Sequence, residues 1–264
     1  MGCVNAILCK YFVFYFCLSL LITLFQTDRW GEKIEQLRCP DKKKQIGSFE
    51  FNDNTEIATG SNGSMIYIGK RVGKEEYVAI KRVNKRLAEN ELKIINHIKG
   101  LELNNVLIPI YHTEDHDFFY MVSPLCKYSL YDLIEGKMDV ITEVKRIQIC
   151  LEFLNGMKEL HSNGIIHRDL KPSNVLIDFT GKLHISDFGV SRVNVANSTH
   201  LTGAVGTLCW MSKEALAGNL VTYKKSSDIQ VCTVFIAYKR SMAPPELLIY
   251  NLWHNNYSNM TNKH

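Results

Sequence analysis

The sequence predicts an α+β fold built as two lobes, a β-rich lobe with one helix followed by a helical lobe. Strand-like segments at 49–51, 65–68 and 77–83 surround a turn rich in Gly, Ser and Asn. Apolar residues at helical spacing follow over 84–99, and a second, longer helical pattern covers 143–161. The chain has 264 residues, 46% of them hydrophobic, which is enough to bury the core of such a fold.

The remaining elements complete the two lobes. Two further strands are predicted at 106–111 and 118–122, and a short helix at 129–135 opens the helical lobe. The buried stripe of the long helix is predicted to consist of Ile147, Ile149, Cys150, Phe153, Leu154, Met157 and Leu160.

The charge balance and the cysteines exclude several classes of function. The net charge of +4 comes from 31 basic and 27 acidic residues, so no direct nucleic-acid binding is expected. The eight cysteines are scattered and none belongs to a Cys-x-x-Cys pair, which argues against zinc and redox sites. Scattered cysteines in a chain of this length are typical of reduced thiols in a cytosolic domain.

The N-terminal region is apolar over residues 11–25. We interpret 1–27 as a candidate membrane or leader segment, with attachment through residues 4–25, although a spanning helix wants roughly 20 apolar residues. The alternative is a leader without function or a mispredicted first exon. Basic residues beyond this segment would place the following domain in the cytoplasm. Residues 28–47 are interpreted as a basic linker.

One polar turn organises the chain. It lies between two short apolar runs and carries Asp169 and Asn174. A second acid, Asp187, follows in an Asp-Phe-Gly sequence, and Lys81 ends an upstream strand that reads Val-Ala-Ile-Lys. This ordered set resembles the eukaryotic protein kinases. The turn reads His-Arg-Asp-Leu-Lys-Pro-x-Asn, and its Lys171 makes it similar to the Ser/Thr kinases.

The resemblance implies ATP and Mg²⁺ as cofactors and a role for each motif residue. Lys81 would hold the α- and β-phosphates, oriented by Glu91, with Glu89 as the competing partner. Asp169 would accept the proton of the substrate hydroxyl or orient that hydroxyl. Lys171 would offset charge on the γ-phosphate.

The resemblance also implies metal ligands and a nucleotide site. Two oxygen ligands together with phosphate oxygens and waters suit Mg²⁺, so the expected ligands are Asn174 and Asp187. In the turn at 58–63, Ala58 replaces the first glycine of the kinase pattern Gly-x-Gly-x-x-Gly. At the hinge, 123–126, Pro124 has no N–H. The residues expected to contact the nucleotide are Ala58, Gly60, Gly63, Met65, Ala79, Lys81, Cys126 and Leu176.

At a finer level, three segments are similar to the inositol-requiring kinase/endoribonuclease family of the unfolded protein response. They are 186–192, 206–216 and the hinge segment that ends at Cys126. This likeness implies a sensor kinase anchored to the endoplasmic reticulum or another membrane. Thr207, in the second segment, matches the part of the kinase pattern near the substrate and is interpreted as structural. Further along the chain, the kinase resemblance implies that Asp228 braces the catalytic turn.

The kinase resemblance covers residues 48–231, with an N-lobe at 48–123 and a partial C-lobe at 124–231. Beyond this range the helical pattern dissolves into an irregular tail at 232–264. The helical lobe is therefore interpreted as incomplete at its C-terminal end.

The predicted function is that of an ATP-dependent protein Ser/Thr kinase that acts on a protein substrate or on itself. Two alternatives follow from the incomplete lobe. One is a catalytically weak, nucleotide-binding scaffold. The other is a dominant-negative partner that forms a homodimer, or a heterodimer with full-length relatives.

Overall fold

The computed structural model describes the chain over residues 29–38, 43–60, 63–135, 143–193, 205–207, 210–212, 215–216 and 223–229. The expected membrane segment at 1–27 and the expected tail at 232–264 therefore lie outside the described residues. Among the helices of the described ranges, none is both long and apolar enough to cross a membrane.

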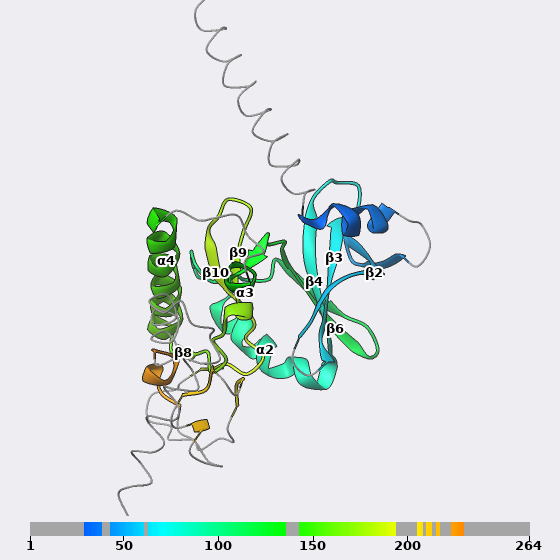
Figure 1. Ribbon diagram of the computed structural model, residues 1–264. Helices are drawn as coiled ribbons and strands as arrows, with labels where there is room; N and C mark the ends of the chain where they lie inside the picture. Colours follow the sequence, from blue (N-terminus) through cyan, green and yellow to red (C-terminus); the bar gives the residue numbers. More distant parts are fainter. Residues whose placement is uncertain are drawn as a thin grey trace, which may run out of the picture.

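The small lobe is an antiparallel sheet with the strand order β1-β2-β3-β4-β6-β5 (Figure 1). Its strands are β1 (Lys43–Ile46), β2 (Phe49–Thr59), β3 (Met65–Arg71), β4 (Tyr77–Asn84), β5 (Tyr111–Glu114) and β6 (Phe118–Pro124). One face of the sheet carries a hydrophobic cluster that includes Phe51, Tyr67 and Ile80. Because side chains alternate along a strand, Ala79 and Lys81 of β4 point to the opposite face.

One helix, α2 (Lys85–Ile98), packs beside this sheet and reaches into the large lobe. The side chain of Asn84 caps its first turn by accepting a hydrogen bond from the backbone N–H of Arg86. Ile94 and Ile98 of α2 belong to the same hydrophobic cluster as Phe153 of the long helix. The two lobes therefore share a core at α2, which lies between the sheet and α4 (Figure 1).

The large lobe begins after β6. Its elements are β7 (Tyr128–Ser129), α3 (Leu130–Ile134), α4 (Glu143–Ser162), β8 (Ile165–Ile166), η2 (Pro172–Asn174), β9 (Val175–Ile177), β10 (Leu183–Ile185) and β11 (Arg192–Val193). Strands β9 and β10 pair antiparallel, and β8 pairs with β11. These short pairs hold the polar turn that lies between β8 and η2.

The segment expected to be a basic linker is instead part of the small lobe. Residues 29–38 form a helix, and β1 pairs with β2 along its whole length. Trp30, Ile34 and Leu37 follow helical spacing, so they share one face, and Ile34 and Leu37 are buried. The many charged residues of this segment hid a narrow apolar stripe that packs on the sheet.

The strand predicted at 106–111 is also wrong. Val106 forms only an isolated bridge with Ile185, and β5 starts at Tyr111. Pro109 interrupts the segment, because proline has no N–H to give to a ladder of hydrogen bonds.

The stripe predicted for α4 was too wide. Ile149, Phe153, Met157 and Leu160 are buried, whereas Ile147 and Leu154 are 52% and 48% exposed. A single helix face spans little more than about 100°, so it cannot bury all seven predicted residues.

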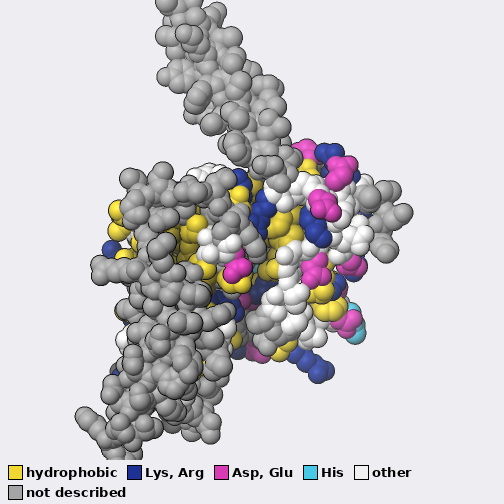
Figure 2. Space-filling model, viewed as in Figure 1, with side chains coloured by type: hydrophobic (Ala, Val, Ile, Leu, Met, Phe, Trp, Pro, Cys, Tyr) yellow, Lys and Arg dark blue, Asp and Glu magenta, His cyan; other side chains and the backbone are white. Residues whose placement is uncertain are grey.

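On the visible face of the molecule, acidic and basic side chains are intermixed over the small lobe (Figure 2).

Candidate active site

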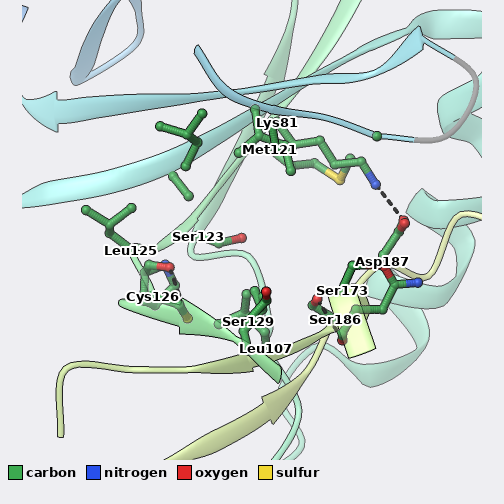
Figure 3. A pocket seen from close by; sticks show the side chains of 18 of the residues that line it. Lys81, Leu107, Met121, Ser123, Leu125, Cys126, Ser129, Ser173, Ser186 and Asp187 are labelled. Atoms are coloured by element: carbon green, nitrogen blue, oxygen red, sulfur yellow. Dashed lines mark hydrogen bonds and ion pairs between the residues drawn. The ribbon is translucent and has the colours of Figure 1, made fainter. Parts of the chain in front are cut away.

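Lys81 lies between two carboxylates at the boundary of the lobes. Its Nζ atom is 2.9 and 2.8 Å from the two carboxylate oxygens of Glu91 and 2.8 Å from Oδ1 of Asp187 (Figure 3). The strand alternation of β4 turns Lys81 toward α2, and Glu91 lies on the buried face of that helix. The competing partner, Glu89, points to solvent and pairs with Lys93 at 2.6 Å. The structure therefore places Glu91, and not Glu89, beside Lys81.

The protonation states of this cluster follow from its burial and its charges. Burial opposes the charged form of Lys81, but the charges of Glu91 and Asp187 outweigh it and raise the pKa of the lysine. Burial also opposes ionisation of Asp187, and the attraction of Lys81 still lowers the pKa of that carboxyl group. Burial raises the pKa of Glu91, and Lys81 offsets only part of this increase. The ammonium group of Lys81 thus stays charged and holds Asp187 ionised.

Asp169 is the centre of a second polar network. Its Oδ2 atom is 2.9 Å from Nζ of Lys171, and its Oδ1 atom accepts a hydrogen bond of 2.8 Å from the hydroxyl of Thr207. Lys171 also donates to this hydroxyl at 2.9 Å. The amide of Asn174 donates to the backbone oxygen of Asp169 at 2.8 Å. Asp169 is 7% exposed, so these contacts fix a nearly buried carboxylate.

Asp228 stabilises the backbone of the catalytic turn, as the sequence predicts. Its carboxylate accepts hydrogen bonds from the backbone N–H groups of His167 (2.8 Å) and Arg168 (2.9 Å). Arg168 has φ of +69°, a left-handed conformation that is costly for a residue with a Cβ. The buried carboxylate stabilises this conformation by pairing two donors that would otherwise lack partners.

The backbone at Asp187 is left-handed as well, with φ of +66°. The next residue, Phe188, is 2% exposed and packs edge-on against the ring of His167. The imidazole Nε2 atom of His167 lies 3.0 Å from the backbone oxygen of Ser186. The buried ring and the turn together aim the Asp187 carboxylate at Lys81.

One cavity of about 410 Å³ connects these groups to the segment that joins the lobes. Most of the predicted nucleotide contacts line it, namely Ala58, Gly60, Ala79, Lys81, Cys126 and Leu176. The catalytic-turn residues Lys171 and Asn174 and the acids Glu91 and Asp187 line it too. Figure 3 shows Ser123, Leu125 and Cys126 at one end of this cavity and Asp187 at the other.

Two predicted contacts, Gly63 and Met65, do not line the cavity. Met65 lies on the other face of the sheet, where its sulfur accepts hydrogen bonds from Tyr67 and Arg82. The register explains the difference, because Ile66 is paired with Lys81 and so shares its face of the sheet. Ile66, together with Ile57 of β2, takes the place expected for Met65.

The segment that joins the lobes offers backbone groups and small side chains. Ser123 is a small residue that lines the cavity, as does Met121 of the same strand. Burial raises the pKa of the Cys126 thiol to about 12, so this side chain stays neutral. The hydrogen-bonding groups that Cys126 offers to a ligand are therefore those of its main chain.

The donor set near Asp187 fits a hard cation that keeps some of its own waters. Asn174 donates through its NH₂ group to Asp169, which leaves its carbonyl oxygen as the group able to bind a metal. Asp187 supplies an ionised carboxylate. Within the described ranges no cluster of three or more His, Cys, Asp or Glu side chains could hold a metal ion alone. Two oxygen ligands completed by phosphate oxygens and water suit Mg²⁺.

Sequence reasoning missed several residues of this site. Thr207 was interpreted as structural, and the sequence did not indicate that its hydroxyl contacts both Asp169 and Lys171. Arg29 and Trp30, which fall in the presumed linker, line the cavity. The helical spacing of Trp30, Ile34 and Leu37 was the signal that could have indicated their packing.

The comparison with known families identifies the fold. The family model described as "Protein kinase domain" matches residues 51–246, and the chain belongs to this family. The α+β fold of two lobes predicted from the sequence is thereby confirmed.

Individual relatives point to the serine/threonine branch. A probable serine/threonine-protein kinase of Dictyostelium discoideum is 34% identical over 194 residues, which are 70% of this chain and 13% of that protein. The serine/threonine-protein kinase shk2 of Schizosaccharomyces pombe is 30% identical, over 75% of this chain and 34% of its own length. The sensor for unfolded proteins in the ER, ire1, of the same yeast is 31% identical, over 67% of this chain and 18% of its length. The chain thus spans about a third or less of the length of these relatives.

Proposed function

We propose that this chain transfers the γ-phosphoryl group of ATP to the hydroxyl of a Ser or Thr residue in a protein. The observation that carries the proposal is the placement of Lys81, Asp187 and Asn174 around one cavity, with Asp169 adjoining it. Phosphoryl transfer needs positioning and charge stabilisation more than covalent chemistry. The described groups supply both.

Each residue has a distinct task in this proposal. Lys81 stays protonated and would bind phosphate oxygens, while Glu91 holds its ammonium group in place. Asn174 and Asp187 would bind Mg²⁺, which neutralises phosphate charge when it is bound. Asp169 would orient the acceptor hydroxyl and receive its proton, and Lys171 would face the transferred group.

The adenine base would occupy the end of the cavity near the inter-lobe segment. Ala79 and Ile66 would form its roof and Leu176 its floor, since these apolar side chains line the cavity. The backbone N–H of Cys126 would donate a hydrogen bond to its polar edge. Gly60 would let the backbone approach the phosphates, because glycine has no Cβ in the way.

The test is transfer of labelled phosphate by the full chain, to itself and to a Ser/Thr-rich protein such as casein. Asp169→Asn should lower the rate by at least about 100-fold, because it removes the proton acceptor. Asp117→Asn is the matched control, since the side chain of Asp117 is 68% exposed and does not line the cavity. Equal labelling by wild type and Asp169→Asn would refute the proposal.

A thermal-shift measurement with ATP and Mg²⁺ separates binding from chemistry. Stabilisation by nucleotide without any transfer would favour the catalytically weak scaffold instead. Stabilisation with transfer supports the kinase.

Narrower proposals concern the biological setting. We propose a relation to unfolded-protein sensors, supported by the segments 186–192 and 206–216 and by the 31% identity to ire1. Autophosphorylation, dimerisation with relatives and attachment through residues 4–25 are further parts of this proposal. Label on the purified chain itself, co-purification with such a relative, and membrane fractionation test them in turn.

A further inference from the structure

The helix at 29–38 precedes the residues that match the family model and is anchored on the small lobe. Ile34 is 3% exposed and forms one hydrophobic cluster with Ile68 of β3 and Leu125. Leu37 is 1% exposed. This helix is therefore fixed both to the sheet and to the segment that joins the lobes.

Trp30 holds the first turn of this helix against the inter-lobe segment. Its indole N–H donates a hydrogen bond of 3.1 Å to the backbone oxygen of Cys126. Its ring packs against the same hydrophobic cluster. Trp30 therefore occupies the backbone oxygen of Cys126 at the end of the cavity that the proposed function assigns to adenine.

Arg29 crosses from this helix to the large lobe. Its guanidinium group is 3.0 Å from the carboxylate of Asp132 in α3 and lies over the rings of Trp30 (4.6 Å) and Tyr128 (4.8 Å). The side chains of Arg29 and Asp132 are only 23% and 12% exposed, so solvent screens this pair less than a surface pair. Burial opposes ionisation of Asp132, but hydrogen bonds from Ser129 and the pair with Arg29 lower the pKa of its carboxyl group.

Both Arg29 and Trp30 line the same cavity as Lys81 and Asp187. They do not fill it, because the cavity of about 410 Å³ is within the usual range of ligand pockets, roughly 300–1,000 Å³. Arg29 and Trp30 thus form part of the wall and connect the roof of the cavity to its floor.

We propose that Arg29 and Trp30 clamp the two lobes at the adenine end of the cavity and raise the affinity for ATP by slowing its release. The proposal rests on the proposed function. Its physical basis is that a ligand binds more weakly when the competent arrangement is only partly populated. A bridge from the small lobe to α3 disfavours arrangements in which the cavity is open. Arg29 and Trp30 are therefore positioning residues.

The first test compares Arg29→Met with wild type in the full chain. Calorimetry with a non-hydrolysable ATP analogue and Mg²⁺ should show affinity reduced by about 3- to 10-fold, the weight of one partly buried ion pair and cation–π contact. Stopped-flow measurements should place this loss in the dissociation rate. KM for ATP should rise by a similar factor while kcat changes by less than about twofold. Unchanged or tighter binding, or a fall in kcat at constant KM, would overturn the proposal.

Lys33→Met is the matched control, because Lys33 lies on the same helix and donates a hydrogen bond to the backbone oxygen of Asn54 within the small lobe. It should leave nucleotide affinity unchanged. If Arg29→Met does not fold, Arg29→Lys keeps the charge but loses the planar stacking and should give a smaller loss.

A double-mutant cycle with Asp132→Asn identifies the bridge itself, since the amide oxygen can still accept from Ser129. Each single change should weaken binding, and the double variant should be no weaker than Arg29→Met. Additive losses would overturn the clamp. If the wild-type chain binds no ATP, this proposal and the proposed function fail together. If it binds ATP and Arg29→Met binds equally well, only the clamp fails.

Discussion

The two ends of the cavity are lined by different kinds of chemical groups. At the phosphate end, charged side chains from distant positions meet, and Lys81 and Asp187 are 106 positions apart in the chain. At the adenine end, Ser123, Leu125 and Cys126 are consecutive or nearly so, and they offer small side chains and backbone groups (Figure 3). The first end depends on residue identity, and the second depends on the path of the main chain.

This difference teaches where substitutions should matter. Buried charges require their partners, so loss of one partner leaves another charge without compensation. Apolar walls and backbone acceptors tolerate exchange, because burial of apolar area depends little on the exact residue. Substitutions at the phosphate end should therefore cost more than those at the adenine end.

The largest effect is expected for Lys81→Met. It leaves the carboxylates of Glu91 and Asp187 facing each other without a cation, which should lower the free energy of unfolding by about 3–5 kcal/mol and abolish phosphate transfer. Urea unfolding and labelled-phosphate transfer measure the two outcomes. Lys93→Met removes an exposed ion pair and should change stability by less than about 0.5 kcal/mol. A similar small change in both variants would contradict the expected contrast.

The support below the catalytic turn should come next. Asp228→Ala removes the acceptor of one buried and one partly buried backbone N–H group and should cost about 2–4 kcal/mol of unfolding free energy. Asp228→Asn retains an acceptor oxygen and should cost roughly half as much. Denaturant unfolding of the two variants checks this order. Equal stability of wild type and Asp228→Ala would show that the conformation of the catalytic turn does not depend on its hydrogen bonds to Asp228.

At the roof of the cavity, Ile66 and Met65 distinguish the observed register from the one expected from the motif. Ile66→Ala should weaken binding of an ATP analogue by about 3- to 10-fold through lost apolar contact. Met65→Ala should change it by less than about twofold, because Met65 lies on the other face of the sheet. The opposite order in calorimetry would restore the expected assignment of Met65.

The last effect is a pH dependence of stability at Asp178, in the β9–β10 turn. Burial opposes its ionisation, but hydrogen bonds from His184, Thr180 and the Lys182 backbone hold its pKa well below its usual range near 3.8. A lowered folded-state pKa stabilises the protein above the unfolded-state pKa, and this contribution is lost as the pH falls. The stability difference between wild type and Asp178→Asn should be about 1–2 kcal/mol at pH 7 and should shrink below about pH 4. A difference that is constant from pH 7 to pH 3 would contradict this cause.

Much of the fold could be predicted from the sequence, because the spacing of apolar residues located several helices and strands and one long motif located the catalytic turn. Helix α2 and strands β3, β4 and β6 lie where the patterns indicated, within a few residues. Pro109 disrupted the segment at 106–111, and α4 buries a narrower face than its apolar content suggested. The helix at 29–38 was missed because its charged residues obscured three apolar positions.

Around the cavity, the polar motif residues were predicted from residue type and order alone. The ordered motifs that contain Lys81, Asp169, Asn174 and Asp187 rarely occur together by chance. The sequence alone therefore indicates the chemistry expected of these residues. Which carboxylate meets Lys81, which face carries Ile66 or Met65, and which hydroxyl meets Asp169 depend on helix phase, strand register and a contact between remote segments. These are properties of packing in three dimensions, and a linear pattern does not encode them. Arg29 and Trp30 show this most clearly, because only the folded arrangement brings them to the wall of the cavity.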